Sequence, residues 1–541
     1  MKKNILLSAL SGLLLWLAWP PTPYTSWLLF VGFVPMLIAI EKIIRSSSIK
    51  KGKKIFAITF LGFFIWNTLC IYWVYNSLKI IGPITAIPIS LIPYSLGPLL
   101  MSSACWLYFR FRVATNKRWL GLIGLVCFWI AYEYLHQSWA LAFPWMTLGN
   151  GFAVSHQLIQ WYEYTGVYGG TIWIWLVNIL IFLIYTGLRE GQNRTLRLTL
   201  ISAFVVALAA PIGFSLYRYN SYTEPVDPSN IVIAQPNIDP YAKESTMPPM
   251  EQLDTLTQLS DSLGQANTEF FIWPETAIED QVNEDSIRTS KYFLMAQHFL
   301  SKYKNGNIIT GAETFKLYNT RKTKTASPTD RPGLFFDDFN AAVNIENSAE
   351  VQFYHKSKLV PGAEAMPFGD ALSFLKPVFE HLGGAVGSYG SQPAPMVFYS
   401  QGGIGADPVI CYESIWGGYV AESVHMGAQF IAIITNDGWW ENTSGKDQHL
   451  DYAKLRAIET RRWVCRSANT GISAFINERG DIVQQTKWWT RAALKQDINL
   501  NQEMTFYVLY GDYLPAIGCI LAVLGVIFIL VMMGVRRFRK A

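Results

Sequence analysis

Long apolar runs constrain this chain more than any other feature of its sequence. A helix needs about 17–25 predominantly apolar residues to cross a bilayer, and eight runs of this length occur. Seven lie before residue 217 and one lies near the end of the chain: residues 4–20, 26–44, 55–75, 84–109, 119–136, 170–187, 196–216 and 511–535. The sequence therefore predicts a polytopic α-helical membrane domain of eight spans.

The composition indicates that a soluble part accompanies the membrane domain. Of the 541 residues, 51% are hydrophobic and 15% are charged, which is too apolar for an ordinary soluble enzyme and too polar for a membrane bundle alone. Between the seventh and eighth runs, strand-like segments alternate with turns rich in Gly, Pro, Asn and Asp. We predict a membrane domain at 1–217, one soluble domain at 218–508, and a last helix with a basic tail at 509–541.

The first apolar run could instead be a cleaved signal peptide, because Lys2 and Lys3 precede it. However, it continues into "WLAWPPTPYTSW", where bulky Trp and Pro stand in place of the small residues that a signal peptidase needs. Trp also suits the membrane interface. We therefore expect the run to be retained as a span.

In the short loops that join the predicted spans, Lys and Arg lie almost entirely at one set of span ends. The opposite set has few, because the connection from 136 to 170 contains none and the turn at 76–83 contains only Lys79. The positive-inside rule then places both termini in the cytoplasm and the soluble domain outside. The net charge of +5 arises at membrane edges and gives no indication of nucleic-acid binding. The basic positions are Lys2, Lys3, "KKGKK" at 50–54, Arg110, Arg112, Lys117, Arg118, Arg189, Arg194, Arg197 and "RRFRK" at 536–540.

Only two of the six cysteines, Cys411 and Cys465, lie in the soluble domain. They could form one disulfide outside the cytoplasm. The sequence has no C-x-x-C motif and no pair of His residues at ligand spacing, so we expect no metal site.

Three segments of the soluble domain each run from an apolar strand into an ionisable residue beside a turn. "TEFFIWPETA" carries Glu275, "VQFYHKSKLVPGAE" carries Lys356 and Glu364, and "ADPVICYES" carries Cys411. Singly, these are ordinary loop charges and a core cysteine. Together they are chemically complementary, because a catalytic thiol needs a general base, a nearby cation or a helix N-terminus.

The segment "ESIWGGYVAESVHMG" predicts a helix directly after Cys411, which would place the sulfur at the positive end of a helix dipole. Cys465 has Arg461, Arg462 and Arg466 around it, but its predicted strand continues through "RSANTGISAFI" without a corner. We therefore predict that Cys411 is the reactive thiol and that Cys465 is a packed residue.

The ordered motifs W-P-E-T-A, Y-x-K-x-x-L-V-P and I-C-Y-E resemble those of the carbon–nitrogen hydrolase (nitrilase) superfamily. Further matches are "IAQPNI" at 233–238, "ITNDGWW" at 434–440 and "NTGISAFI" at 469–476. The apolar flanks, with "FPWMTLGN" and "LIQWYEYTGVYGG", are similar to the membrane branch of that superfamily, the bacterial apolipoprotein N-acyltransferases.

The resemblance implies an αββα sandwich at 218–508, facing the periplasm from the bacterial cytoplasmic (inner) membrane. It implies acyl transfer from a phospholipid, typically phosphatidylethanolamine, to the amine of a diacylglyceryl-cysteine apolipoprotein. By motif position, Cys411 is the nucleophile, Glu275 the general base and Lys356 the oxyanion-stabilising cation. Glu364, Tyr412 and Glu413 match supporting positions. We expect a monomer that uses no cofactor and no metal.

The stretch after Lys356 departs from the family pattern. The family commonly has V-P-F-G-E there, whereas this chain has "VPGAE", with Gly362 and Ala363. The spacing to Glu364 is kept, so we expect the acid to be retained in an altered loop.

Two features of the membrane domain have alternative interpretations. The aromatic connection 137–169 is either a wall or gate of the site or a belt of Trp and Phe at the membrane interface. Glu133 is either functional or an interfacial acid.

Two other functions are compatible with the sequence. A membrane-anchored nitrilase-type amidase would use the same triad on a soluble amide, but it would need only one span. A channel or transporter is disfavoured because the spans hold few ionisable residues.

Overall fold

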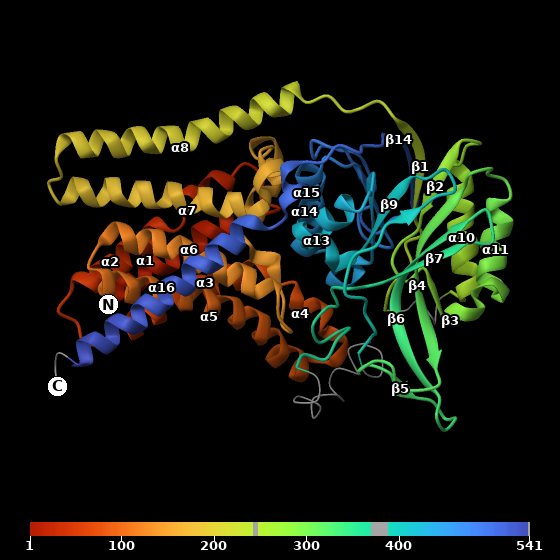
Figure 1. Ribbon diagram of the computed structural model, residues 1–541, viewed down its shortest axis with the longest axis horizontal. Helices are drawn as coiled ribbons and strands as arrows, with labels where there is room; N and C mark the ends of the chain where they lie inside the picture. Colours follow the sequence, from red (N-terminus) through yellow and green to blue (C-terminus); the bar gives the residue numbers. More distant parts are fainter. Residues whose placement is uncertain (242–246, 369–387, 539–541) are drawn as a thin grey trace. The chain divides into compact units, whose positions relative to one another are not determined.

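The computed structural model describes residues 1–241, 247–368 and 388–538, and the chain forms two compact units (Figure 1). The first unit comprises Met1–Tyr75, Pro83–Ser221 and Asp512–Ala541. The second unit comprises Tyr222–Gly511 together with the short segment Asn76–Gly82.

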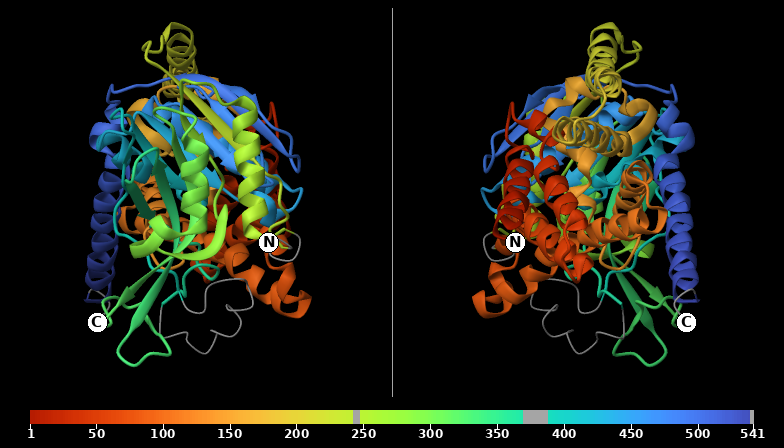
Figure 2. Two further views of the ribbon diagram at one scale, coloured as in Figure 1. Left: turned by 90° about the vertical axis from the view of Figure 1, so that its right-hand side faces the viewer. Right: turned by 90° about the vertical axis from the view of Figure 1, so that its left-hand side faces the viewer.

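The first unit is helical, and the right-hand view of Figure 2 looks onto this unit, with the blue α16 seen along its length. Among the described residues, seven helical segments are long and apolar enough to cross a membrane: Ser26–Arg45, Lys51–Ile71, Pro83–Thr115, Arg118–Gln137, Tyr162–Arg189, Arg194–Ser221 and Tyr513–Arg536. The helices are α1 (Lys2–Leu17), η1 (Ser26–Phe30), α2 (Val34–Arg45), α3 (Lys51–Ile71), α4 (Val74–Ser77), η2 (Lys79–Ile81), α5 (Pro83–Thr115), α6 (Arg118–Gln137), η3 (Pro144–Met146), η4 (Leu148–Leu158), α7 (Tyr162–Arg189), α8 (Arg194–Ser221) and α16 (Tyr513–Phe538).

The first predicted span differs from the other seven because α1 has only 16 residues. At about 1.5 Å per residue it is shorter than the roughly 30 Å hydrocarbon core. It runs parallel to α3, since the Ser8 hydroxyl donates to the Ile58 carbonyl and Gly12 meets Gly62 one turn further along both helices. A Cβ on Gly12 would lie 2.3 Å from the Gly62 carbonyl oxygen, so only small residues permit this approach. The count of eight spans stays a prediction.

Ion pairs hold several basic helix ends together. Arg112 near the end of α5 donates to Glu41 of α2, with Nη2 3.0 Å from Oε1. Glu190, just after α7, binds Arg45 at 2.6 Å and Arg118 at 3.3 Å. The ends of α2, α5 and α7 and the start of α6 therefore share one end of the bundle, as the charge pattern predicted.

The connection between α6 and α7 turns inward. Its Trp145 and Phe152 are buried, and the Phe152 ring lies 5.4 Å from the Phe30 ring. Glu133 of α6 fixes the connection, because its carboxylate accepts hydrogen bonds from the Leu148 amide and the Thr171 hydroxyl, both at 2.8 Å. Trp145 and Phe152 are therefore core residues of the bundle, and Glu133 is a buried, hydrogen-bonded acid.

The described residues of the second unit form two β-sheets. The larger has the order β14-β1-β2-β4-β6-β5, with β3 beside β4 and β7 beside β6, and the smaller has the order β13-β12-β11-β10-β9-β8. The strands are β1 (Pro228–Gln235), β2 (Thr268–Ile272), β3 (Ile278–Asn283), β4 (Asn307–Tyr318), β5 (Ser327–Pro328), β6 (Phe335–Glu346), β7 (Val351–His355), β8 (Phe398–Tyr399), β9 (Gly405–Ile410), β10 (Phe430–Thr435), β11 (Val464–Ala468), β12 (Ala474–Ile476), β13 (Ile482–Gln485) and β14 (Ala492–Asn499).

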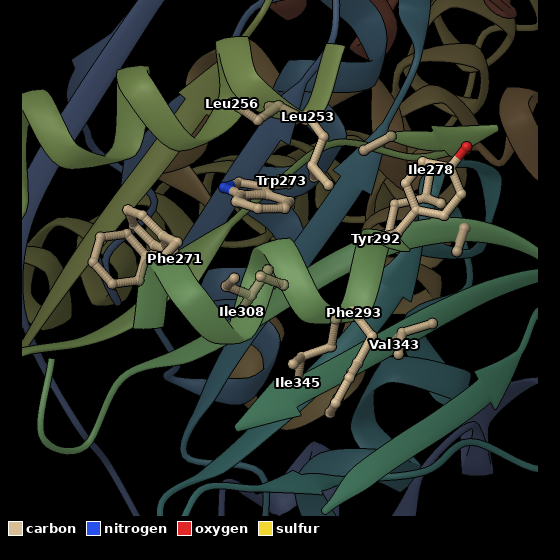
Figure 3. Packing of buried hydrophobic residues seen from close by; sticks show 14 of the residues in the cluster. Leu253, Leu256, Phe271, Trp273, Ile278, Tyr292, Phe293, Ile308, Val343 and Ile345 are labelled. Carbon is tan, nitrogen blue, oxygen red and sulfur yellow. The ribbon is translucent and has the colours of Figure 1, made fainter. Parts of the chain in front are cut away.

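Helices cover the outer face of each sheet. The left-hand view of Figure 2 looks onto α10 and α11 in front of the larger sheet, and Figure 3 shows Leu253 and Phe293 of these helices around Trp273. Helices α13 and α14 cover the smaller sheet. The helices of this unit are α10 (Pro249–Leu263), η5 (Glu284–Thr289), α11 (Lys291–Leu300), η7 (Cys411–Ile415), α13 (Gly417–His425), η8 (Asp437–Trp440), α14 (Ser444–Thr460) and α15 (Phe506–Tyr510).

The inner faces of the two sheets pack on each other, and the rings of Phe270 on β2 and Phe430 on β10 lie 5.0 Å apart. The predicted αββα sandwich is therefore confirmed. The central strands β1, β2 and β4, and likewise β9, β10 and β11, run parallel and are buried on both faces. Their carboxyl ends meet at one edge, which is where parallel sheets place functional residues.

Candidate active site

Glu275 follows β2 in a turn that β4 holds in place. The Gly311 amide of β4 donates to the Pro274 carbonyl at 3.0 Å. A Cβ on Gly311 would lie 2.6 Å from the Cα of Glu275, so the two backbones come this close only because residue 311 is glycine. The next residue, Thr276, has a φ of 48°, which bends the chain away and leaves the buried Glu275 carboxylate at the strand end.

Lys356 follows β7 and meets two carboxylates. Its Nζ lies 3.0 Å from Oε1 of Glu275 and 2.7 Å from Oε1 of Glu364. Asn340 of β6 donates to the same two oxygens, at 2.9 Å and 3.0 Å. Both hydrogen bonds found for Glu275 in the described residues end on Oε1, which leaves Oε2 for a further proton.

The electrostatics of this cluster keep Lys356 charged. Burial disfavours its ammonium form, but the carboxylates of Glu275 and Glu364 outweigh burial and raise the pKa of Lys356 well above its usual value. The side chain is 1% exposed, so its charge acts where water screens it little.

The unusual loop after Lys356 keeps Glu364 in place. Gly362 has a φ of 85°, a conformation that favours glycine, and its amide donates to the Ala365 carbonyl at 2.8 Å. The second carboxylate oxygen of Glu364 accepts the Val360 amide at 2.8 Å. The structure thus brings Glu364 to Lys356, as the preserved spacing predicted, on a tight turn that Gly362 permits.

Cys411 stands at the sharp corner directly after β9. Its φ of 51° is in the left-handed region, which is strained for a residue with a side chain and marks functional turns. The helix predicted directly after Cys411 is present, but it begins later than predicted, so the predicted dipole contact with the sulfur is wrong. Residues Cys411–Ile415 form one short 3-10 helix, and α13 begins only at Gly417, because Trp416 between them is extended.

The environment of Cys411 favours the thiol over the thiolate. Burial raises the pKa of Cys411, the charge of Glu275 raises it further, and Lys356 opposes both. Because α13 begins only at Gly417, no α-helix N-terminus lies at this sulfur. A base must take its proton during attack, and Glu275 is the carboxylate whose charge acts most strongly on Cys411.

Glu413 connects the cysteine corner to the lysine strand. Its Oε1 accepts hydrogen bonds from the Tyr354 hydroxyl at 2.6 Å and the Ser357 amide at 2.7 Å, while Oε2 accepts the Ile410 amide at 2.9 Å. Burial raises the pKa of Glu413, and these donors oppose that shift. Because Ser357 follows Lys356 and Ile410 precedes Cys411, Glu413 fixes the two reactive segments relative to each other.

A second charged cluster lies behind Cys411. His449 of α14 has Nδ1 2.9 Å from Oδ1 of Asp437 and Nε2 3.2 Å from the Cys411 carbonyl oxygen. The Ser414 hydroxyl donates to the same carbonyl at 2.9 Å, and Arg466 of β11 binds Oδ2 of Asp437 at 2.6 Å. Burial disfavours the Asp437 carboxylate, but Arg466 and His449 outweigh it and hold its pKa well below the usual range.

Sequence reasoning missed this cluster and Asn340. "ITNDGWW" contains Asp437, but nothing in the sequence around His449 marks it, since it lies inside a buried helix. Asn340 lies within β6 and not at a strand end. The cluster around Asp437 and the position of Asn340 become visible only when segments that are distant in the sequence are brought together by the fold.

The remaining predicted positions are buried beside the corner. Tyr412 packs edge-on against Trp416 at 4.8 Å between ring centres. Cys465 lies within β11, fully buried, and burial raises its pKa too. Both Cys411 and Cys465 are free thiols, so the disulfide alternative is wrong. Within the described ranges, no group of three or more His, Cys, Asp or Glu side chains is arranged to hold a metal ion.

Comparison with known families agrees with this geometry. Residues 232–504, half of the chain, match the family described as carbon-nitrogen hydrolase. The chain belongs to the carbon–nitrogen hydrolase family. Residues 11–180 match the family described as apolipoprotein N-acyltransferase N-terminal domain. The region that matches the carbon–nitrogen hydrolase family thus follows a helical region that matches a second family.

Two relatives align with nearly the whole chain. The apolipoprotein N-acyltransferase of Chlorobaculum tepidum is 27% identical over 526 residues, which is 95% of this chain and 94% of the relative. That of Geobacter metallireducens is 26% identical over 518 residues, 94% of this chain and 92% of the relative.

Solved structures are similar to part of the chain. A CN-hydrolase superfamily protein from Xanthomonas campestris has 14% identity and a TM-score of 0.36, covering 51% of this chain and 91% of that protein. Nit3 of Saccharomyces cerevisiae, a nitrilase superfamily member, has 12% identity and a TM-score of 0.37, covering 50% and 90%.

Proposed function

We propose that this protein is an apolipoprotein N-acyltransferase of the bacterial inner membrane. The observation that carries this proposal is the combination, in one chain, of the N-acyltransferase helical domain at 11–180 and the carbon–nitrogen hydrolase domain at 232–504. Relatives with the acyltransferase name align with both domains together. The amidase alternative is not favoured, because a soluble amide requires no second domain of membrane-length helices.

In the first half of the reaction, Cys411 takes an acyl chain from a phospholipid ester. Glu275 accepts the thiol proton while the sulfur attacks the ester carbonyl. Lys356 and the amide of Tyr412 stabilise the negative charge on the carbonyl oxygen. The carbon–oxygen bond then breaks, the lysophospholipid oxygen takes up the proton from Glu275, and a thioester remains on Cys411. The buried cluster supports each assignment: the cation is held beside the base, and the base keeps a free oxygen.

In the second half, the α-amine of a diacylated apolipoprotein attacks the thioester. Glu275 accepts a proton from the amine, the carbon–sulfur bond breaks, and the proton returns to the Cys411 sulfur. An amide forms and the free thiol is restored, which gives ping-pong kinetics. Cys411 is 9% exposed, and such burial favours an amine acceptor over hydrolysis, because it limits the access of water to the thioester.

The finer features of the assembly belong to the same proposal. The acyl donor is phosphatidylethanolamine, the enzyme acts as a monomer, and the chain crosses the membrane eight times with both termini in the cytoplasm. The parallel packing of α1 and α3 supports the eighth crossing, since Lys2 and Lys51 then begin their helices on the same side. A reporter that works only outside the cytoplasm should be active when fused after residue 300 and inactive at Ala541. The reverse pattern contradicts this topology.

Release of lysophospholipid from membranes that contain the enzyme tests the function. The account predicts that release continues over many turnovers only when a diacylated lipopeptide with a free amine is added, and that the lipopeptide gains one acyl chain in amide linkage. An N-acetylated lipopeptide is the matched control, because it lacks the attacking amine. Equal release with both peptides, or hydrolysis of a soluble amide by the same enzyme, would favour the amidase alternative.

A further inference from the structure

A cavity of about 330 Å³ lies between α5 and α16 within the helical unit. Apolar side chains of both helices line it, among them Phe109 and Val113 of α5 and Ile529 and Met533 of α16. The spacing is helical on each side, so one face of α5 meets one face of α16. Since both helices are membrane candidates, the apolar part of this cavity lies beside acyl chains.

Two arginines, Arg110 and Arg536, also line the cavity. They stand at the basic end of the bundle, where Arg112 is neutralised by Glu41 and Arg118 by Glu190. None of the ion pairs found among residues 1–241, 247–368 and 388–538 includes Arg110 or Arg536. The cavity therefore holds two positive charges without a carboxylate partner in the described residues, unlike Arg112 and Arg118.

The contacts of these two guanidinium groups leave donors available. Arg110 lies over the Trp106 ring, 5.4 Å from its centre, and donates to the Met533 sulfur, which is a weak acceptor. Arg536 donates one hydrogen bond to the Val113 carbonyl at 2.8 Å. A guanidinium has five N–H donors in a planar fork, which matches the oxygens of a phosphate.

We propose that this cavity binds the phosphate of an anionic phospholipid, whose acyl chains lie along the apolar faces of α5 and α16. A basic pocket between membrane helices, with arginines at the headgroup level and apolar residues below, has the charge and polarity of such a lipid. Every lining residue belongs to the helical unit, so this lipid is not the acyl donor in the Cys411 site. The proposal holds whether or not acyl transfer is the reaction.

Native mass spectrometry of the full-length protein, purified in detergent and mixed with phosphatidylglycerol or phosphatidylcholine, tests this site. We expect retention of phosphatidylglycerol over phosphatidylcholine, and a loss of roughly tenfold in its affinity for each of Arg110→Gln and Arg536→Gln. Lys117→Gln is the matched control, because it removes one exposed positive charge near the same end of α5 without touching the cavity. This control should bind phosphatidylglycerol like the original protein.

A second pair of variants and a competitor complete the test. Arg110→Lys and Arg536→Lys keep the positive charges, so they should fold even if the Gln variants do not. They should still bind phosphatidylglycerol less tightly than the original protein, because an ammonium does not form the forked contact with a phosphate. Millimolar inorganic phosphate should leave lipid retention unchanged. Equal retention in all variants, equal loss in Lys117→Gln, or displacement of the lipid by inorganic phosphate would overturn the proposal.

Discussion

Two buried charged clusters lie on either side of Cys411, and their geometry differs. Each places one cation beside carboxylates: Lys356 with Glu275 and Glu364, and Arg466 with Asp437. The Lys356 cluster comes from the ends of strands in the larger sheet, whereas the Arg466 cluster comes from the smaller sheet and the helix that covers it.

The difference lies in which oxygens are occupied. Both oxygens of Asp437 are taken, Oδ1 by Thr435 and His449 and Oδ2 by Arg466. Glu275, by contrast, receives its two hydrogen bonds on one oxygen. Oε2 of Glu275 is therefore open to a proton from a reacting group, whereas both oxygens of Asp437 are occupied and its partner His449 contacts the backbone of Cys411. The first is suited to proton transfer and the second to holding a strained nucleophile.

The largest expected effect is that of Glu275→Gln. The amide keeps the size of the side chain but accepts no proton, so acylation of the enzyme should slow by about 10²–10⁴-fold, the range for loss of a general base. Single-turnover release of lysophospholipid measures this rate. Glu279→Gln, in the following strand and outside the cluster, is the control. A fall of less than tenfold would remove Glu275 from the role of base.

Lys356→Met should lower the acylation rate by about 10²–10³-fold, the effect of losing one donor to a developing oxyanion. Arg should not restore activity, because its planar fork does not occupy the position of an ammonium. Lys358→Met is the matched control, since Lys358 lies against the Tyr419 ring instead of the carboxylates. A nearly normal rate in the Lys356 variant would show that the oxyanion is stabilised elsewhere.

The Lys356 cluster could be predicted from the sequence, because its charged residues follow recognisable strands. Strand ends are local features, and carboxyl ends of neighbouring parallel strands meet at one edge whatever the rest of the fold. The membrane helices could be predicted equally well from the sequence, since the length of a span is a property of one continuous apolar run. For the first span the run and the helix differ in length: the run continues to residue 20, but the helix ends at Leu17 before Trp19 and the two prolines.

The Arg466 cluster could not be predicted, because its members are distant in sequence and lie inside regular elements. Arg466 looked like a neighbour of Cys465, yet in a strand adjacent residues point to opposite faces. The helix after Cys411 was misplaced for a related reason: the apolar pattern continues through Ser414 and Ile415, and it is the extended conformation of Trp416 that delays α13 to Gly417.

His449→Gln tests whether the second cluster only holds the nucleophile. We expect a fall of roughly tenfold in kcat with an unchanged KM and an unchanged pH profile of acylation, because His449 contacts the Cys411 carbonyl and not its sulfur. Disturbing the buried hydrogen bonds should also lower the free energy of unfolding by about 1–3 kcal/mol. A pH profile that loses one limb in this variant would instead make His449 a proton-transfer group.

Substitutions of Glu275 and Lys356 should shift the pH dependence of Cys411 alkylation in opposite directions. These effects should be smaller than those on the acylation rate. Burial raises the thiol pKa, so the iodoacetamide reaction should be slow at pH 7 and still accelerate above pH 9, where an ordinary thiol levels off. Glu275→Gln removes a negative charge, which lowers the pKa and speeds alkylation at a given pH. Lys356→Met removes a positive charge and slows it. Peptide mass spectrometry measures both rates, and shifts in the same direction would contradict the charge assignment.

The smallest expected effect is that of Cys465→Ala. Cys465 lies within β11 and is a free thiol, so its loss should lower the free energy of unfolding by about 1 kcal/mol, as for a small buried truncation. Urea denaturation of the purified protein measures this change. A loss of about 2–5 kcal/mol would be typical of a missing disulfide and would contradict the free-thiol state.

The acyl-enzyme itself tests the central claim most directly. The protein is incubated with phosphatidylethanolamine and no acceptor amine, and its cysteine peptides are weighed before and after hydroxylamine treatment. The account predicts one hydroxylamine-labile acyl chain on the Cys411 peptide, absent in Cys411→Ala and retained in Cys465→Ala. An acyl chain on the Cys465 peptide, or an adduct that persists in Cys411→Ala, would contradict the assignment of the nucleophile.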